Sequence, residues 1–217
     1  MKNRLSKLIE SEQSKRKNKP RNYIGASSIG SDCLRQIWYE YQGEQGEPIT
    51  PKLMRTFDIG KQLEALVMDW LEESGIPIAR IWTDLKSENV PEFQGHLDAV
   101  WTNQNDAFVI IEIKTANDAS FKAFVKKGLK LWNPQYYTQI QSYMGMSGIK
   151  STYIVVLNKD SSELSDELVI FDEVFYREIE GKAIMIRDAK LPPPKINGSP
   201  LWYQCKQCKF NKVCHEI

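Results

Sequence analysis

The stretch that decides the fold is FVIIEIKT, residues 108–115. It is typical of a buried β-strand because Val and Ile dominate it, yet it carries Glu112 and Lys114 two positions apart. On a strand, residues two apart share a face, so both charges point the same way while Ile111 and Ile113 point into the opposite layer. Because an unpaired buried ion costs several kcal/mol, these two charges indicate a functional cluster of side chains.

A second strand precedes this one and places polar side chains on one of its faces. In QGHLDAVW, residues 94–101, His96 and Asp98 alternate with apolar residues, and the polar turn TNQNDA follows. The hairpin can bring Asp98 beside Glu112, where two carboxylates repel each other. A divalent cation resolves this conflict, since Mg²⁺ and Mn²⁺ prefer hard oxygen ligands and accept carboxylates together with water and phosphate oxygens. Lys114 then supplies positive charge for a phosphate under attack.

The plainer alternative is a surface strand with an incidental ion pair between Glu112 and Lys114. Exposed cross-strand ion pairs are common and contribute little to stability. The position of Asp98 weighs against this alternative. We interpret His96 as a residue that packs on the strand or lies near a phosphate, and not as a catalytic base.

Asp98, followed after a 13-residue gap by Glu112, Ile113 and Lys114, resembles the D…(D/E)xK signature of the PD-(D/E)XK nuclease superfamily. Leu97 replaces the proline of that signature, a departure that is frequent in the superfamily. The resemblance implies an α/β, restriction-endonuclease-like fold with a mixed central sheet flanked by helices, and metal-dependent hydrolysis of phosphodiester bonds. It also implies that Asp98 and Glu112 hold one or two Mg²⁺ or Mn²⁺ ions with help from the Ile113 carbonyl, and that Lys114 positions the nucleophilic water.

Two further motifs indicate which branch of this superfamily the chain resembles. QIQSY sets Gln139 and Tyr143 on one helical face after the hairpin, and it resembles the QxxxY motif of RecB-type nucleases. GKQLE puts Glu64 four residues after Gly60, as in λ-exonuclease-like members, whereas many relatives with iron-sulfur clusters carry histidine there. We therefore expect Glu64 to be a further metal ligand, and Gln139 and Tyr143 to orient the site or contact DNA. A solvent-facing glutamate and a polar helix face are the alternatives.

The four cysteines form a second candidate site. CKQCKFNKVC spaces Cys205, Cys208 and Cys214 as CxxC-x5-C, and Cys33 comes from the far end of the chain. Four thiolates suit one tetrahedral or cubane site, and the spacing alone does not separate Zn²⁺ from an iron-sulfur cluster. The resemblance favours a 4Fe-4S cluster, because AddB-type and CRISPR-adaptation nucleases place one cysteine before the nuclease core and three after it. Zn²⁺ remains the alternative.

Composition indicates the class of protein and its compartment. The chain has 217 residues, 41% of them hydrophobic and 26% charged, with a net charge of +1, which is typical of a soluble globular protein with one main domain. It has neither a long apolar run nor a signal-peptide core, so we expect a cytoplasmic location, in a bacterial or phage-infected cell, and no membrane partner. In such a compartment, cysteines favour a metal site over disulfides.

The residue pattern also predicts the elements and their grouping. Helices are expected over 5–12, 31–42, 52–74, 120–130, 134–146 and 172–188, and strands over 76–82, 93–101, 108–115, 152–157 and 167–171. The chain is expected to divide into a basic N-terminal segment (1–20), a nuclease core (21–190) and a cysteine module (191–217). Cys33 joins this module, so both chain ends build a small iron-sulfur subdomain.

Basic and aromatic residues indicate where a nucleic acid would bind. Lysines and arginines crowd the first 21 positions, where a polyanion could bind, although a solvated terminus has the same composition. A groove that follows the DNA backbone and stacks its bases is expected from Arg35, Lys122, Lys126, Lys127, Lys130, Trp132 and Tyr136. Solubilising helix charges are the alternative.

These motifs together predict a metal-dependent DNA exonuclease of phage or bacterial recombination and repair. Action on single-stranded DNA or DNA ends is what the resemblance implies. A CRISPR-adaptation nuclease that processes spacers, and a non-catalytic DNA-binding subunit of the same fold, are the alternatives. A helicase, a recombinase or an adaptation complex is the expected protein partner.

Overall fold

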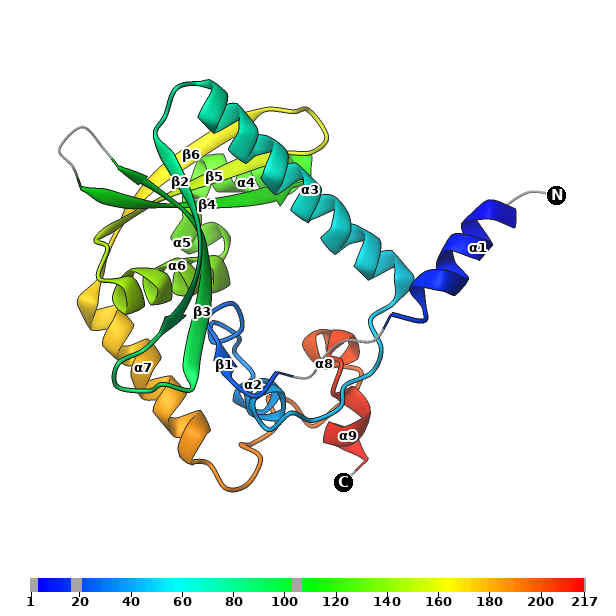
Figure 1. The fold of residues 1–217 in the computed structure, drawn as a ribbon. Helices are drawn as coiled ribbons and strands as arrows, with labels where there is room; N and C mark the ends of the chain where they lie inside the picture. The colour runs from blue at the N-terminus through cyan, green and yellow to red at the C-terminus, as the bar shows by residue number, and fades with distance from the viewer. Residues whose placement is uncertain (1–3, 17–20, 103–106, 217) are drawn as a thin grey trace.

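A mixed β-sheet forms the centre of the molecule (Figure 1). The computed structural model describes residues 4–16, 21–102 and 107–216, without the side chains of 80–82 and 98. Within these residues the sheet has six strands, in the order β1-β3-β4-β5-β6 with β2 also paired to β3. They are β1 (Ile24–Gly25), β2 (Ile78–Lys86), β3 (Phe93–Thr102), β4 (Phe108–Ala116), β5 (Ser151–Asn158) and β6 (Leu164–Ile170).

Strand β4 lies at the centre of the sheet and has one antiparallel and one parallel neighbour. β3 runs antiparallel to β2 and β4, with Ala99 opposite Ile111. β4 and β5 are parallel, with Glu112 opposite Ile154, and β6 returns antiparallel to β5. Parallel neighbours need a long crossover connection, and the chain between β4 and β5 supplies it with three helices.

Helices cover both faces of the sheet (Figure 1). They begin where the sequence offers capping groups: the Thr50 side chain accepts a hydrogen bond from the Leu53 amide at the start of α3, and Asn133 does the same for Tyr136 at the start of α6. The described helices are α1 (Arg4–Gln13), α2 (Leu34–Tyr41), α3 (Pro51–Glu73), α4 (Asp118–Lys127), α5 (Leu129–Trp132), α6 (Pro134–Ser147), α7 (Glu173–Asp188), α8 (Tyr203–Gln207) and α9 (Asn211–His215).

Two apolar clusters lie on opposite faces of β4. Ile110 belongs to the larger cluster, with Ile140 and Met144 of α6 and with residues of α7. Ile111 and Ile113 belong to the smaller one, which Val67 and Met68 of α3 cover. This alternation confirms the prediction that Ile111 and Ile113 face away from Glu112 and Lys114, whereas Ile110 shares the face of the two charged residues.

Most of the predicted elements are present, and the differences are local. The helix expected over 52–74 is a single helix, that over 120–130 is divided between α4 and α5, and the strand expected over 76–82 extends to Lys86. The predicted turn at 102–107 and several basic residues of the N-terminal segment fall mainly outside the described residues. The division of the chain into an N-terminal segment, a core and a cysteine module stays a prediction. In the part of the chain that is described, no helix has both the length and the hydropathy to span a bilayer.

Candidate active site

The charged pair of β4 lies inside the protein. Glu112 is 5% exposed, and its Oε1 atom lies 2.6 Å from the Nζ atom of Lys114, whose side chain is 15% exposed. The alternative of a surface strand with an incidental ion pair is therefore wrong. Burying two charges costs more than a surface pair and is weak evidence for stability, so the pair calls for a functional explanation.

Burial and charge act in opposite directions on Lys114. Burial alone lowers the pKa of this ammonium group, but the charge of Glu112 and its hydrogen bond outweigh that effect, so the pKa is raised above its ordinary value. Tyr136 and the Glu64 carboxylate raise it further. Lys114 is thus a protonated, largely desolvated cation.

The backbone puts Asp98 at the position next to Glu112. Ala99 pairs with Ile111 across the β3–β4 ladder, and one further step of that antiparallel register would align Asp98 with Glu112. The side chain of Asp98 lies outside the described part of the structure. The prediction that the two carboxylates share a cation therefore stays a prediction.

Helix α3 lies beside the C-terminal end of β4 and carries Glu64. A Cβ atom added to Gly60 would lie 3.9 Å from Oγ1 of Thr115, which places this turn of α3 beside the strand end. Glu64 follows one turn later, half-buried, and its charge acts on Lys114. Glu64 is therefore not a fully solvent-facing glutamate, and its role as a metal ligand stays a prediction.

Helix α6 covers the other side with Gln139 and Tyr143. Both are buried, and Nε2 of Gln139 donates a hydrogen bond of 2.7 Å to the Tyr143 hydroxyl. The Tyr143 ring lies against Gly95 of β3, where an added Cβ atom would approach its Cε1 atom to 2.7 Å. The two residues are therefore a buried pair close to β3, and not a polar face in solvent.

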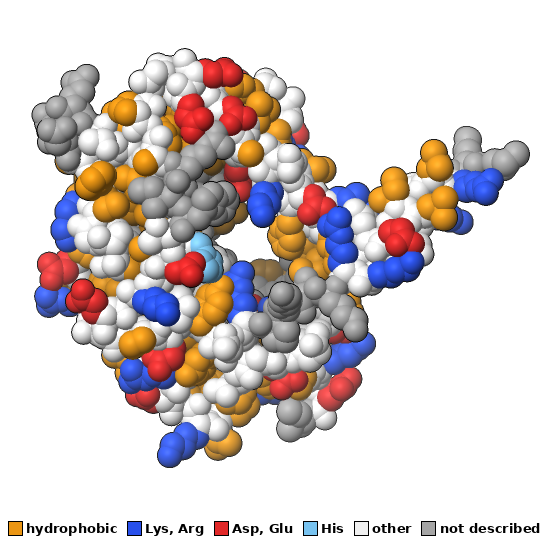
Figure 2. All heavy atoms as spheres, viewed as in Figure 1, with side chains coloured by type: hydrophobic (Ala, Val, Ile, Leu, Met, Phe, Trp, Pro, Cys, Tyr) orange, Lys and Arg blue, Asp and Glu red, His pale blue; other side chains and the backbone are white. Residues whose placement is uncertain are grey.

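His96 has different surroundings from those expected for a packed residue. It is exposed on β3, its Nδ1 atom lies 2.7 Å from Oδ1 of Asp84, and its Nε2 atom lies 3.2 Å from the Tyr23 hydroxyl. Figure 2 shows a hollow at the centre of the molecule, with a histidine and with charged side chains of both signs at its rim. The prediction that His96 packs on the strand is wrong, and its interpretation as a neighbour of a phosphate stays open.

The residues predicted to form a DNA groove do not share one surface. Trp132 and Tyr136 are half-buried and pack against the larger apolar cluster, so the expectation that they are exposed is wrong. Nε of Arg35 donates a hydrogen bond to the carbonyl of Pro193, and the Arg35 side chain lines the cysteine cavity. Lys122 pairs with Asp118. The remaining predicted members, Lys126, Lys127 and Lys130, are exposed on α4 and α5.

Sequence reasoning placed Tyr136 in a DNA groove and missed its contact with Lys114 in the candidate site. Its ring centroid lies 4.7 Å from Nζ of Lys114. The signal available in the sequence was its position on α6, three residues before Gln139 and therefore on a neighbouring part of the same helical face.

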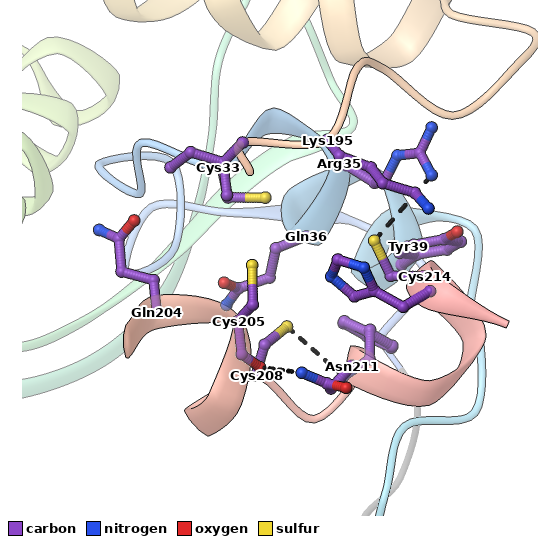
Figure 3. Close-up of a pocket in the computed structure, with 13 residues that line it drawn as sticks. Cys33, Arg35, Gln36, Tyr39, Lys195, Gln204, Cys205, Cys208, Asn211 and Cys214 are labelled. Atoms are coloured by element: carbon purple, nitrogen blue, oxygen red, sulfur yellow. Dashed lines mark hydrogen bonds between the residues drawn. The ribbon is translucent and has the colours of Figure 1, made fainter. Parts of the chain in front are cut away.

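The four cysteines line one cavity, as expected, although they come from opposite ends of the chain (Figure 3). Cys33 precedes α2, Cys205 lies in α8, and Cys214 lies in α9. Burial raises the pKa of the Cys205 thiol, and the nearby Cys33 and Cys214 raise it further. The pKa of the Cys208 thiol is raised by burial as well, so these two groups favour the neutral thiol, and a bound cation would be needed to stabilise them as thiolates.

Other groups of the cavity also suit a metal centre. Nη1 of Arg35 lies 4.0 Å from the Cys214 sulfur, and Nε2 of His215 is buried without a hydrogen-bond partner. A buried polar atom without a partner is rare, and a group bound in the cavity is one explanation for it. Sulfur donors fit zinc and iron-sulfur clusters alike. Within the described residues, however, no three Cys, His, Asp or Glu side chains are arranged to hold a metal ion as they stand.

No protein-family model matches the chain, and neither does any curated protein. Solved structures do match it. The alkaline exonuclease LHK-Exo from Laribacter hongkongensis, also solved in complex with dAMP, is 16% identical with a TM-score of 0.59, over 83% of this chain and 90% of that one. The protein SSO0001 is 20% identical with a TM-score of 0.55, over 97% of this chain and 93% of that one.

A third solved structure is a phage-related exonuclease from Haemophilus somnus 129PT. It is 12% identical with a TM-score of 0.53, over 81% of this chain and 94% of that one. At these identities the likeness concerns the fold. The chain therefore has a mixed α/β fold similar to that of these exonucleases.

Proposed function

We propose that this chain is a divalent-metal-dependent DNA exonuclease that hydrolyses phosphodiester bonds on single-stranded DNA or at DNA ends. The observation that carries the proposal is the buried Glu112–Lys114 pair in β4. The pair lies beside the strand that bears Asp98, and Lys114 contacts Tyr136 of α6, the helix that also bears Gln139 and Tyr143. Solved structures of similar fold that are described as exonucleases support the choice of reaction.

The donor set fits a hard cation such as Mg²⁺ or Mn²⁺. Asp98, Glu112 and Glu64 offer carboxylate oxygens, and Ile113 offers its backbone carbonyl. When bound, the cation offsets the repulsion between these carboxylates and adds positive charge at the phosphate under attack. Glu112 already lies in a site with little solvent, where such charges act strongly.

The remaining residues act on the water and on the DNA. Lys114 is a protonated donor next to the carboxylate, so it can orient the attacking water and stabilise the charge that develops on the phosphate oxygens. Gln139 and Tyr143 hold each other in place and present polar groups beside β3, where they orient the site or contact the DNA.

We further propose that Cys33, Cys205, Cys208 and Cys214 bind a 4Fe-4S cluster, with Zn²⁺ as the alternative. The shared cavity, the sulfur donors and the unpartnered Nε2 atom of His215 support a metal group there. Its role would be to join the two chain ends, and the DNA chemistry would belong to the carboxylate site.

The biological setting that we propose is phage or bacterial recombination and repair, with a helicase or recombinase as the partner. The likeness to a phage-related exonuclease supports this choice. Two other functions are the alternatives for a chain of this fold. One is a CRISPR-adaptation nuclease, whose cysteine arrangement this chain resembles, and the other is a non-catalytic DNA-binding subunit.

The test is digestion of single-stranded DNA labelled at its 5′ or 3′ end, with Mn²⁺ and with EDTA. We expect stepwise shortening from one end with Mn²⁺ and none with EDTA. Lys114→Ala should lower the rate at least about 100-fold, because it removes a donor to the developing charge, and it should leave DNA binding intact.

The matched control is Lys159→Ala, since Lys159 forms an exposed ion pair with Asp160 outside the candidate site. It should cleave like the parent. If the parent shifts the DNA in a gel but leaves it uncut with every divalent metal, the chain is a binding subunit. If Lys114→Ala cleaves near the parent rate, Lys114 has no part in the reaction.

A further inference from the structure

Two groups hold the ammonium of Lys114, and the second has a role yet to be assigned. Oε1 of Glu112 lies 2.6 Å from Nζ, and the ring centroid of Tyr136 lies 4.7 Å from the same atom. At this separation the electron-rich face of an aromatic ring attracts a cation, and the attraction grows when water is excluded. The Lys114 side chain is largely buried, so the contact is in the favourable range.

The Tyr136 ring is itself fixed by its neighbours. The Asn133 side chain caps the first turn of α6 by accepting a hydrogen bond from the Tyr136 amide at 3.1 Å. The Trp132 ring packs against Tyr136 with centroids 5.7 Å apart, and Nε1 of Trp132 donates to Oγ of Ser120 at 2.9 Å. Phe124 supports Trp132 from the other side at 5.1 Å. We call Phe124, Trp132 and Tyr136 the aromatic brace.

We propose that Tyr136 is the positioning residue for Lys114, and that its ring keeps the ammonium in place when Glu112 binds the cation. This inference rests on the proposed nuclease function. A carboxylate shared with a divalent cation attracts a neighbouring lysine less strongly, so Lys114 needs a second partner during the reaction. An aromatic face meets this need, because it attracts the ammonium without competing for the metal.

The brace joins the helices of the crossover between β4 and β5. Ser120 and Phe124 of α4 both contact Trp132 of α5, which packs against Tyr136 of α6. Residues that lock a side chain in one orientation reduce the reorganisation required at the moment of reaction. The brace thus links the helix packing to the position of one reactive group.

The experiment compares Tyr136→Phe and Tyr136→Leu in full-length protein. If the ring is the active part, Tyr136→Phe should keep kcat within about twofold, and Tyr136→Leu should lower it roughly 2- to 30-fold, the range expected for loss of one cation–π contact. The Kd for DNA should not change. In the Lys114→Ala background Tyr136→Leu should have no further effect, because it acts only through Lys114.

A matched control is Phe171→Leu. Phe171 is another half-buried ring under a lysine, with Nζ of Lys150 4.5 Å from its centroid, at the end of β6. Its loss should leave kcat unchanged. NMR gives a readout that needs no activity: the ε-methylene protons of Lys114 should be shifted upfield in the parent and in Tyr136→Phe, and should lose this shift in Tyr136→Leu.

The possible results separate this inference from the proposed function. Full activity of Tyr136→Leu with an inactive Lys114→Ala would overturn the role of Tyr136 and leave the nuclease proposal standing. Equal losses in Tyr136→Phe and Tyr136→Leu would also overturn it, because the hydroxyl and not the ring would then matter. An inactive parent overturns the proposed function, and the positioning role with it, even where the upfield shift shows the contact.

Discussion

Glu112 and Lys114 form an ion pair with little exposure to solvent. The charge of Glu112 raises the pKa of Lys114 despite burial, so the ammonium stays protonated at neutral pH. Replacing such a pair by apolar residues of similar volume is often neutral or stabilising, which makes stability a poor reason for its presence. A site that must present both a carboxylate and a cation to a phosphate gives a better reason.

The alternation in FVIIEIKT was enough to predict which side chains share a face, because a strand has a period of two. The degree of burial could not be predicted from it. That depends on residues from elsewhere in the sequence, such as Tyr136 of α6, whose ring lies beside Lys114.

Gly95 provides a test of the position of Tyr143. An alanine Cβ atom at this site would lie 2.7 Å from Cε1 of Tyr143 and 3.1 Å from Cβ of Ala26. Gly95→Ala should therefore cost about 1–3 kcal/mol by overpacking and move the Tyr143 ring. We expect a lower melting temperature together with a lower cleavage rate, measured by thermal unfolding and by DNA digestion.

Gly181→Ala is the matched control for this substitution. Gly181 lies inside α7, and no atom lies within 4 Å of an added Cβ atom. It should stabilise the protein by about 0.5–1 kcal/mol, because alanine favours a helix more than glycine does. A Gly95→Ala variant as stable and active as the parent would mean that the Tyr143 ring does not lie against β3.

Helix α6 buries polar residues that its sequence suggests are exposed. Its polar residues suggest a solvent-facing side, yet Thr138, Gln139, Gln141 and Ser142 are all buried. Each finds a partner: Thr138 and Ser142 donate to carbonyls one turn earlier, and Gln141 bonds the backbone of Ile170 and Asp172. Because buried polar groups are tolerated when they are hydrogen-bonded, helical periodicity of apolar residues alone underestimates this burial.

Helix α3 shows the opposite case. Its apolar residues at helical spacing predicted a long helix correctly, but only Met54, Val67 and Met68 among them are buried. Phe57 and Ile59 remain more than half exposed. The pattern predicts the helix, whereas the length over which it contacts the sheet depends on where the chain turns before and after it.

At the scale of the whole molecule, the segment that follows Cys33 packs against the C-terminal cysteine segment. The Glu47 amide donates a hydrogen bond of 2.6 Å to the Lys209 carbonyl, and the Glu47 carboxylate pairs with Lys212 at 2.8 Å. Lys209 pairs with Glu40 at 3.0 Å. The cysteine spacing predicted that these two segments meet. The supporting ion pairs could not be predicted, because they join segments that are distant in sequence.

Cys208→Ala tests the metal group that we propose for this junction. Binding energy of a structural metal group is also folding energy, so its loss should destabilise the whole chain. Even about 3 kcal/mol would lower the melting temperature by roughly 6–12 °C in a protein of this size. We expect the brown colour of anaerobically purified protein, its iron content and its thermal stability to fall together.

The matched control for this variant is Gln207→Ala, since Gln207 is the exposed neighbour of Cys208. It should keep both colour and stability. A colourless and fully stable parent that contains zinc would contradict the cluster and favour the zinc alternative.

The central claim is that a divalent cation binds between the carboxylates of β3 and β4, and Mn²⁺ titration followed by electron paramagnetic resonance tests it most directly. The parent, Asp98→Asn, Glu112→Gln and the exposed control Glu163→Gln should be compared after removal of bound metals. We predict that Asp98→Asn and Glu112→Gln each weaken Mn²⁺ binding at least about tenfold while Glu163→Gln does not. A parent that binds no Mn²⁺, or a Glu112→Gln variant that binds it like the parent, would contradict the claim.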